Sequence, residues 1–104
     1  MAVILRLIQR FHPSKKEQFL ELEKEFAALE ERGVLPKGER MMPIAAREPA
    51  NTFVWQRRFA NLSAAEATLK LFDTSSEHAE LAKKQLPCFT DAWVELYEVL
   101  DFSS

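Results

Sequence analysis

Glycine and cysteine are scarce in this chain, and long apolar runs are missing. Only two glycines occur among 104 residues, so the chain has neither a glycine-rich phosphate loop nor a dinucleotide-binding fingerprint. The single Cys88 cannot form an internal disulfide, which is typical of a reducing compartment and of a small buried apolar side chain. The apolar opening segment is short, is interrupted by Arg6 and lacks an export cleavage site. We therefore expect a cytoplasmic protein with no membrane role.

The chain also lacks a strong charge of either sign and a metal-ligand motif. Its net charge is −2 and its pI is about 5.7, so a polyanion would meet no global attraction, and we expect no nucleic-acid partner. The two histidines lie far apart, without a His-Glu-x-x-His or paired-cysteine pattern. We therefore predict no metal site and no cofactor.

The composition is that of an ordinary globular protein, with 47% hydrophobic and 29% charged residues. A chain of 104 residues can bury enough apolar surface for one core without a disulfide or a metal. We expect a single domain over residues 1–104.

Four segments alternate in polarity with the period of a β-strand. They cover residues 3–11, 39–48, 52–60 and 92–102. Pro43 lacks the N–H that a ladder needs, so the second strand should lie at a sheet edge or carry a bulge. The third strand is rich in aromatic and β-branched residues, which favours the strand assignment.

Two helical segments lie between these strands. In the first, apolar residues recur every three or four positions at Phe19, Leu22, Phe26 and Leu29. The acidic positions between them, including Glu23 and Glu30, are interpreted as outward-facing, and Gly33 should close the helix. The second segment should break near residues 73–76, and Pro87 should stop it. Capping-box spacing predicts helix starts at Ser14 with Glu17, Ser63 with Glu66, and Thr74 with Glu77.

The element order β-α-β-β-α-β predicts a ferredoxin-like α+β fold, with the first and third strands central and both helices on one face of an antiparallel sheet. We expect two apolar rows to lie beneath the helices: Val3, Leu5 and Leu7, and Val94, Leu96 and Leu100. The opposite face should then expose Ile4, Arg6, Ile8, Trp93, Glu95, Tyr97 and Val99. Such a patch favours association, and a twofold homodimer that closes sheet against sheet would cover it.

The element order, the break at residues 75–78 (Ser-Ser-Glu-His) and the closing strand at residues 93–100 (Trp-Val-Glu-Leu-Tyr-Glu-Val-Leu) resemble the dimeric α+β-barrel superfamily. Its small members include antibiotic-biosynthesis-monooxygenase-like, NIPSNAP-like and stress-responsive barrel proteins, and the resemblance covers nearly the whole chain. It implies a small organic ligand held between helices and sheet or within the barrel. For an enzyme, it implies cofactor-independent oxygenation or proton transfer on an electron-rich substrate.

Three charges interrupt otherwise apolar alternation: Arg6, Arg57 or its neighbour Arg58, and Glu95. A buried charge must be paired or must meet a ligand. The favoured interpretation is an ion-pair network that joins strands or subunits. The alternative is that Arg6 or Arg57 orients an anionic oxygen of an acidic or enolic aromatic ligand, since a guanidinium binds a carboxylate through two parallel hydrogen bonds.

The remaining candidate site residues are one histidine and several aromatic side chains. His78 lies in the first turn of the last short helix, where the helix field should favour neutral imidazole. His78 or Glu95 is the candidate for moving a proton. Trp55, Trp93 and Tyr97 could stack on a planar ligand, although aromatic residues at strand period more often belong to a core or an interface. The rival function is a non-catalytic dimeric binding or structural protein without a pocket of convergent polar groups.

Overall fold

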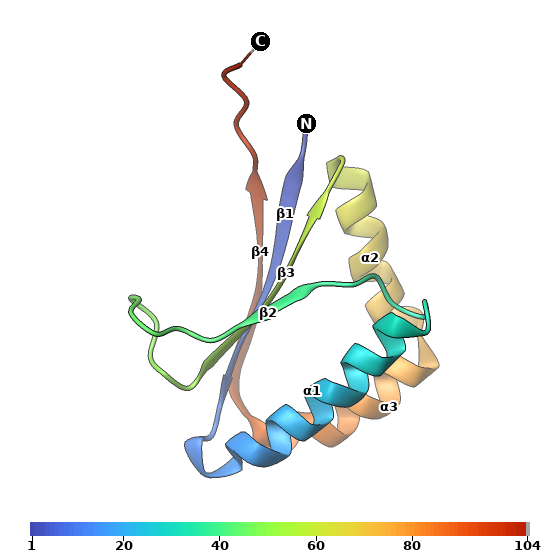
Figure 1. The fold of residues 1–104 in the computed structure, drawn as a ribbon. Helices are drawn as coiled ribbons and strands as arrows, with labels where there is room; N and C mark the ends of the chain where they lie inside the picture. The colour runs from blue at the N-terminus through green and yellow to red at the C-terminus, as the bar shows by residue number, and fades with distance from the viewer. Residues whose placement is uncertain (104) are drawn as a thin grey trace.

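The chain forms a four-stranded antiparallel sheet with its helices on one side (Figure 1). The structure is a computed structural model that describes residues 1–103. Its elements are β1 (Val3–Phe11), a 3-10 turn (Pro13–Lys15), α1 (Lys16–Glu31), β2 (Glu39–Met41), β3 (Thr52–Phe59), α2 (Leu62–Thr74), α3 (Ser76–Gln85), a second 3-10 turn (Leu86–Cys88) and β4 (Phe89–Glu98). The strand order β2-β3-β1-β4 places β1 and β3 at the centre. The predicted ferredoxin-like α+β fold is therefore confirmed.

Strand pairing separates the side chains of the sheet into two faces. Leu7 lies opposite Trp55 of β3 and Val94 of β4, on the face that carries the helices. Ile8 lies opposite Val54 and Trp93, on the other face, which we call the open face. The open face also carries Ile4, Arg6, Arg10, Gln56, Arg58, Glu95 and Tyr97.

The apolar stripe of α1 packs onto the sheet as its helical spacing predicts. Its members Phe19, Leu22, Phe26 and Leu29 are all buried. The Phe19 ring stacks on Phe11 with 5.0 Å between centroids, which joins α1 to the end of β1. Gly33 follows α1 with φ +78°, the left-handed conformation that glycine adopts without strain. Cys88 is fully buried, as expected for a small apolar side chain.

The helices begin at different residues from those that the capping-box spacing predicts. Lys15 precedes α1 without a side-chain cap. Asn61 caps α2 by accepting from the Ala64 N–H at 2.9 Å, and Ser75 caps α3. The predicted caps at Ser14, Ser63 and Thr74 are wrong because a cap needs extended backbone at its own position, which Asn61 and Ser75 have. No helix within residues 1–103 is both long and apolar enough to cross a bilayer.

Two strands differ in length from the predicted segments. β2 ends at Met41, before Pro43, because proline cannot donate to the ladder, and Ile44 beyond it is fully exposed. Its place at the sheet edge is as predicted. β4 is shifted toward the N-terminus relative to the prediction, since Glu98 pairs with Val3, the first residue of β1, and the sheet has no partner strand further on.

The structure corrects two expectations about burial. Val94 and Leu96 lie on the helix-bearing face but are 49% and 43% exposed, and Leu100 lies beyond β4 and is also exposed. The reason is that α2 packs on β1 and β3, so the helices do not cover Val94 and Leu96 in the middle of the outer strand β4. On the open face, Ile8 is buried rather than exposed, because its cross-strand neighbours flank it and Arg10 lies over the adjacent Trp93 ring.

Candidate functional site

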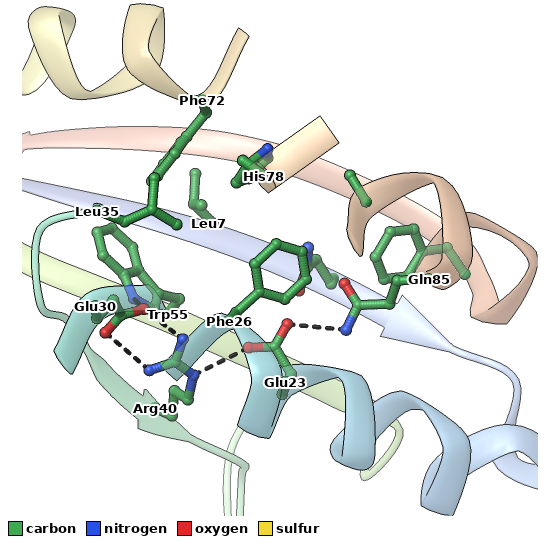
Figure 2. Close-up of a pocket in the computed structure, with 13 residues that line it drawn as sticks. Leu7, Glu23, Phe26, Glu30, Leu35, Arg40, Trp55, Phe72, His78 and Gln85 are labelled. Atoms are coloured by element: carbon green, nitrogen blue, oxygen red, sulfur yellow. Dashed lines mark hydrogen bonds and ion pairs between the residues drawn. The ribbon is translucent and has the colours of Figure 1, made fainter. Parts of the chain in front are cut away.

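A pocket of about 80 Å³ lies between the helices and the helix-bearing face of the sheet. Figure 2 shows side chains from the sheet and from all three helices converging on it. Most of the wall is apolar, and the rings of Phe26, Trp55, Phe72 and Phe89 contribute to it. The polar members of the wall are Gln9, Glu23, Glu30, Arg40, His78 and Gln85. A mostly apolar cavity with a few convergent polar groups is the usual form of a small-ligand site.

Arg40 of β2 links two carboxylates of α1 along one side of the pocket (Figure 2). Its Nε donates to Oε2 of Glu23 at 3.0 Å, and its Nη1 donates to Oε1 of Glu30 at 3.0 Å. The Nη2 atom donates to the other oxygen of Glu30. Arg40 reaches this position because it pairs with Trp55 in the β2–β3 ladder and so points toward the helices. Its guanidinium is committed to both carboxylates.

Glu30 is saturated with hydrogen bonds. Besides the two from Arg40, its Oε1 accepts from the Gly38 N–H at 3.1 Å and its Oε2 accepts from Nε1 of Trp55 at 3.2 Å. The backbone at Gly38 comes so close that an added Cβ would lie 2.1 Å from the Trp55 ring. Glycine is therefore required here, since only a residue without a side chain lets the backbone approach. Four donors compensate the burial of the Glu30 charge.

Glu23 is the less satisfied carboxylate. It accepts from Arg40 Nε and, at 2.9 Å, from Nε2 of Gln85 on α3. Gln85 is itself 1% exposed and also donates to the Phe19 carbonyl at 3.3 Å. Burial raises the pKa of Glu23, and the hydrogen bonds from Gln85 and Arg40 oppose that rise in pKa. Glu23 is thus a carboxyl group at the pocket that holds a proton more readily than an exposed glutamate.

His78 lies between two aromatic rings at another side of the pocket. Its imidazole stacks on Phe72 with 4.9 Å between centroids and lies 5.2 Å from the Phe26 ring. Burial lowers the pKa of His78, whereas the nearby Asp73 carboxylate raises it. The sequence predicts neutral imidazole on account of the helix field, but the main cause in the structure is loss of solvent. His78 can therefore accept a proton inside the pocket.

The residues singled out from the sequence divide into separate groups in space. His78 and Trp55 line the pocket, with Trp55 also forming part of the buried core. Arg57 lies on the helix-bearing face but outside the pocket, where its guanidinium donates to the Lys37 carbonyl and lies over the Phe59 ring at 5.4 Å. The other four, Arg6, Trp93, Glu95 and Tyr97, lie on the open face, so the sheet separates them from His78.

The open-face residues form a cluster around Glu95. Trp93 Nε1 donates to one oxygen of Glu95 at 3.0 Å, and Tyr97 O–H donates to the other at 2.7 Å. Arg6 lies 3.7 Å from Glu95 and 5.8 Å from the Tyr97 ring centre. Hydrogen bonds from Tyr97 and Trp93, with a smaller effect of Arg6, hold the pKa of Glu95 below its usual value. We call these four residues the Glu95 cluster.

The carboxylates of the pocket are not among the site residues predicted from the sequence. The prediction that Glu23 and Glu30 lie on the outward face of α1 is wrong, because both are buried at 7% exposure. A signal for them exists: Phe19, Glu23, Phe26 and Glu30 follow each other at steps of four, three and four, so the glutamates belong to the apolar stripe itself. In residues 1–103 no three His, Cys, Asp or Glu side chains converge in a way that could hold a metal ion.

Comparison with known proteins gives similarity in structure but not in sequence. No protein-family model matches the chain, and no curated protein matches it in sequence. A NIPSNAP family protein from Agrobacterium tumefaciens superposes with a TM-score of 0.80 at 12% identity, covering 99% of this chain and 97% of that one. An uncharacterized NIPSNAP-like domain protein from Burkholderia xenovorans gives 0.77 at 15% identity, covering 99% and 89%. An antibiotic biosynthesis monooxygenase gives 0.69 at 14% identity, covering 97% and 100%.

These similarities confirm the fold that the sequence resemblance implies. The chain has the same α+β architecture as NIPSNAP-like and antibiotic-biosynthesis-monooxygenase-like proteins. At identities of this level, the likeness defines the fold alone, and fold does not by itself define function.

Proposed function

We propose that this protein is a cytoplasmic homodimer that binds a small organic ligand in the pocket between its helices and its sheet. The observation that carries the proposal is the polar wall of that pocket, where the buried Glu23 and Gln85 and the half-buried Arg40 join one another in a wall that also contains aromatic rings. Burying an ionic group is costly, and replacing such groups by apolar ones of similar size is often neutral or stabilising for a core. Their presence beside a cavity supports a binding role.

An enzymatic version of this function is proton transfer followed by monooxygenase-like oxidation by dioxygen, in which the ligand supplies the electrons, one oxygen atom enters the ligand and the other leaves as water. It is supported by the presence in one pocket of a buried carboxyl and a neutral imidazole, Glu23 and His78. Either could take a proton from an acidic O–H or C–H of the ligand. Glu95, the other residue proposed from the sequence to move a proton, lies on the open face and would not reach this pocket in the same subunit.

The homodimer is proposed from the open face. That face presents Tyr97 at 47% exposure, with Ile4 and Trp93 half-buried beside it. The Glu95 cluster supplies charges of both signs, so a twofold axis could bring Arg6 of one copy toward Glu95 of the other. In this proposal the cluster serves the interface, as in the non-catalytic alternative, and the ligand site is separate from it.

The ligand site can be tested by filling the pocket. Ala82 of α3 lines it, whereas Ala79, one turn earlier, is exposed. We expect Ala82→Leu to abolish the retention of any compound that copurifies with the wild-type protein in native mass spectrometry, and Ala79→Leu to leave it unchanged. Circular dichroism checks that both variants fold. Equal retention of the compound by Ala82→Leu and by the wild type would place the binding site elsewhere.

A further inference from the structure

The charges along the pocket wall do not balance. Two carboxylates, Glu23 and Glu30, share the single guanidinium of Arg40. Both terminal nitrogens of Arg40 donate hydrogen bonds to Glu30. Glu30 also accepts hydrogen bonds from Gly38 and Trp55. Glu23 receives from Arg40 only the single Nε bond, together with a neutral amide hydrogen bond from Gln85. The ionised wall therefore carries a surplus negative charge at Glu23.

No other cation in residues 1–103 compensates this charge. Lys24, the next residue on α1, is exposed and pairs instead with Glu21 at 2.9 Å. The titratable pocket residue of α3 is His78, whose pKa burial lowers, and Asp73 of α2 near it adds a negative charge. The pocket residues contributed by β1 and β3, which are Leu7, Gln9 and Trp55, carry no charge.

The remaining pocket wall contains aromatic rings, which suit a cation. Trp55 and Phe72 meet edge to face, with 5.7 Å between centroids and 77° between planes, and His78 stacks on Phe72. Phe26 and Phe89 contribute two further rings. The faces of aromatic rings carry negative electrostatic potential and attract ammonium groups, most strongly in a desolvated site. An aromatic enclosure with an unbalanced carboxylate at its side is a combination that recognises alkylated and primary ammonium groups.

We propose that the pocket binds a small organic cation, with its ammonium group directed at Glu23 and its alkyl part against Phe26, Trp55 and Phe72. This inference rests on the proposed ligand-binding function and names the chemistry of the ligand. The cavity of about 80 Å³ limits the enclosed part of the ligand to a few non-hydrogen atoms. A carboxylate ligand is disfavoured, because Arg40 has no free pair of donors for it and Glu23 would repel it.

The test uses three probes of nearly equal shape and different charge: tert-butylammonium, tert-butanol and pivalate. Binding is measured by ligand-observed NMR titration at neutral pH. We expect the cation to bind the wild-type protein about tenfold more tightly than the alcohol, and pivalate to bind more weakly than either. Tighter binding of the alcohol or of pivalate than of the cation would overturn the proposal.

Two further measurements separate the role of Glu23 from general electrostatics. Glu23→Gln should reduce the preference for the cation to within about twofold, since the surplus charge is removed. Glu21→Gln makes the same change in charge on the exposed side of α1 and should leave the preference unchanged. In the wild-type protein, binding of the cation should strengthen as pH rises through the pKa of Glu23, because a proton on Glu23 competes with the ligand. A preference that survives Glu23→Gln, or that does not depend on pH, contradicts the inference.

Failure of the cation inference can be distinguished from failure of the proposed function. If the alcohol binds at least as tightly as the cation and Ala82→Leu abolishes its binding, the pocket binds ligands but does not select cations. If none of the probes binds the wild-type protein, the cation inference fails, and the copurification test with Ala82→Leu alone then decides the proposed function.

Discussion

Gln85 of α3 donates a 2.9 Å hydrogen bond to Oε1 of Glu23 on α1, across 62 positions in the sequence. Both side chains are buried, so the bond joins two helices through polar groups inside an otherwise apolar layer. Gln85 also donates a hydrogen bond to the Phe19 carbonyl. This second bond fixes the side-chain amide of Gln85 in the orientation that reaches the Glu23 carboxyl group. This contact makes Glu23 part of the fold as well as part of the pocket.

The stability of the protein should depend on the ionisation of Glu23. The pKa of Glu23 is raised above 4.5 in the folded protein, so the folded state binds the proton more tightly than the unfolded state. The stabilisation by the proton is complete below the unfolded pKa and is lost as pH rises through the folded pKa. Urea unfolding of the wild type and of Glu23→Gln between about pH 4 and pH 8 should show the wild type losing stability relative to the variant. If the difference in unfolding free energy between the wild type and Glu23→Gln did not depend on pH, the raised pKa of Glu23 would be contradicted.

His78 should titrate below its usual range. Burial among Phe26 and Phe72 lowers the pKa of His78 from 6.5, while Asp73 opposes this effect. In an NMR titration we expect the pKa of the imidazole to lie below that of an exposed histidine, and Asp73→Asn to lower this pKa further. The His12→Gln variant assigns the signal, because the chain has two histidines. If Asp73→Asn raised the pKa of His78, the electrostatic account of this site would be wrong.

Arg40 should contribute more to stability than an exposed arginine in an ion pair. Arg40→Leu leaves Glu23 and Glu30 buried without their cation and should cost about 3–5 kcal/mol of unfolding free energy. Arg32→Leu, which removes an exposed pair with Glu77, should cost about 0–1 kcal/mol. Urea unfolding at neutral pH measures both. Similar small costs for the two variants would show that the buried carboxylates do not need Arg40.

The proposed homodimer should be visible in solution. At micromolar concentration we expect sedimentation equilibrium to give twice the chain mass of 12.0 kDa. Tyr97→Glu adds a charge to the open face and should shift the protein toward monomer. Leu71→Glu adds the same charge at an exposed position of α2 and should not shift the protein toward monomer. If the wild-type protein sediments as a monomer, the proposed homodimer through the open face is wrong.

The sequence predicts the order and type of the elements because the strand and helix periods are local properties. The first strand and the apolar stripe of α1 are examples, since each face is defined within a few residues. The pocket depends instead on the pairing of β2 with β3. Only the register that sets Arg40 opposite Trp55 brings a cation to Glu23 and Glu30. This register cannot be read from a strand of three residues next to a proline.

The same distinction explains the error at the outer strand. Alternation assigns Val94 and Leu96 to the correct face of β4, but their burial depends on how far the helices extend across the sheet. That extent is a property of helix packing and has no counterpart in the pattern of a single strand. The assignment of Arg6, Trp93, Glu95 and Tyr97 to the face opposite the helices is confirmed, because alternation defines the two faces of a strand locally.

The close approach of Gly38 to the Trp55 ring has a consequence for the breadth of the binding cavity. Gly38 does not line the cavity, yet one methyl group at this position would displace the indole that does. Gly38 therefore affects the size of compound that fits, because it determines where the Trp55 ring can lie. A redesign that aims to admit larger or smaller compounds therefore has to keep Gly38 or change Trp55 together with it.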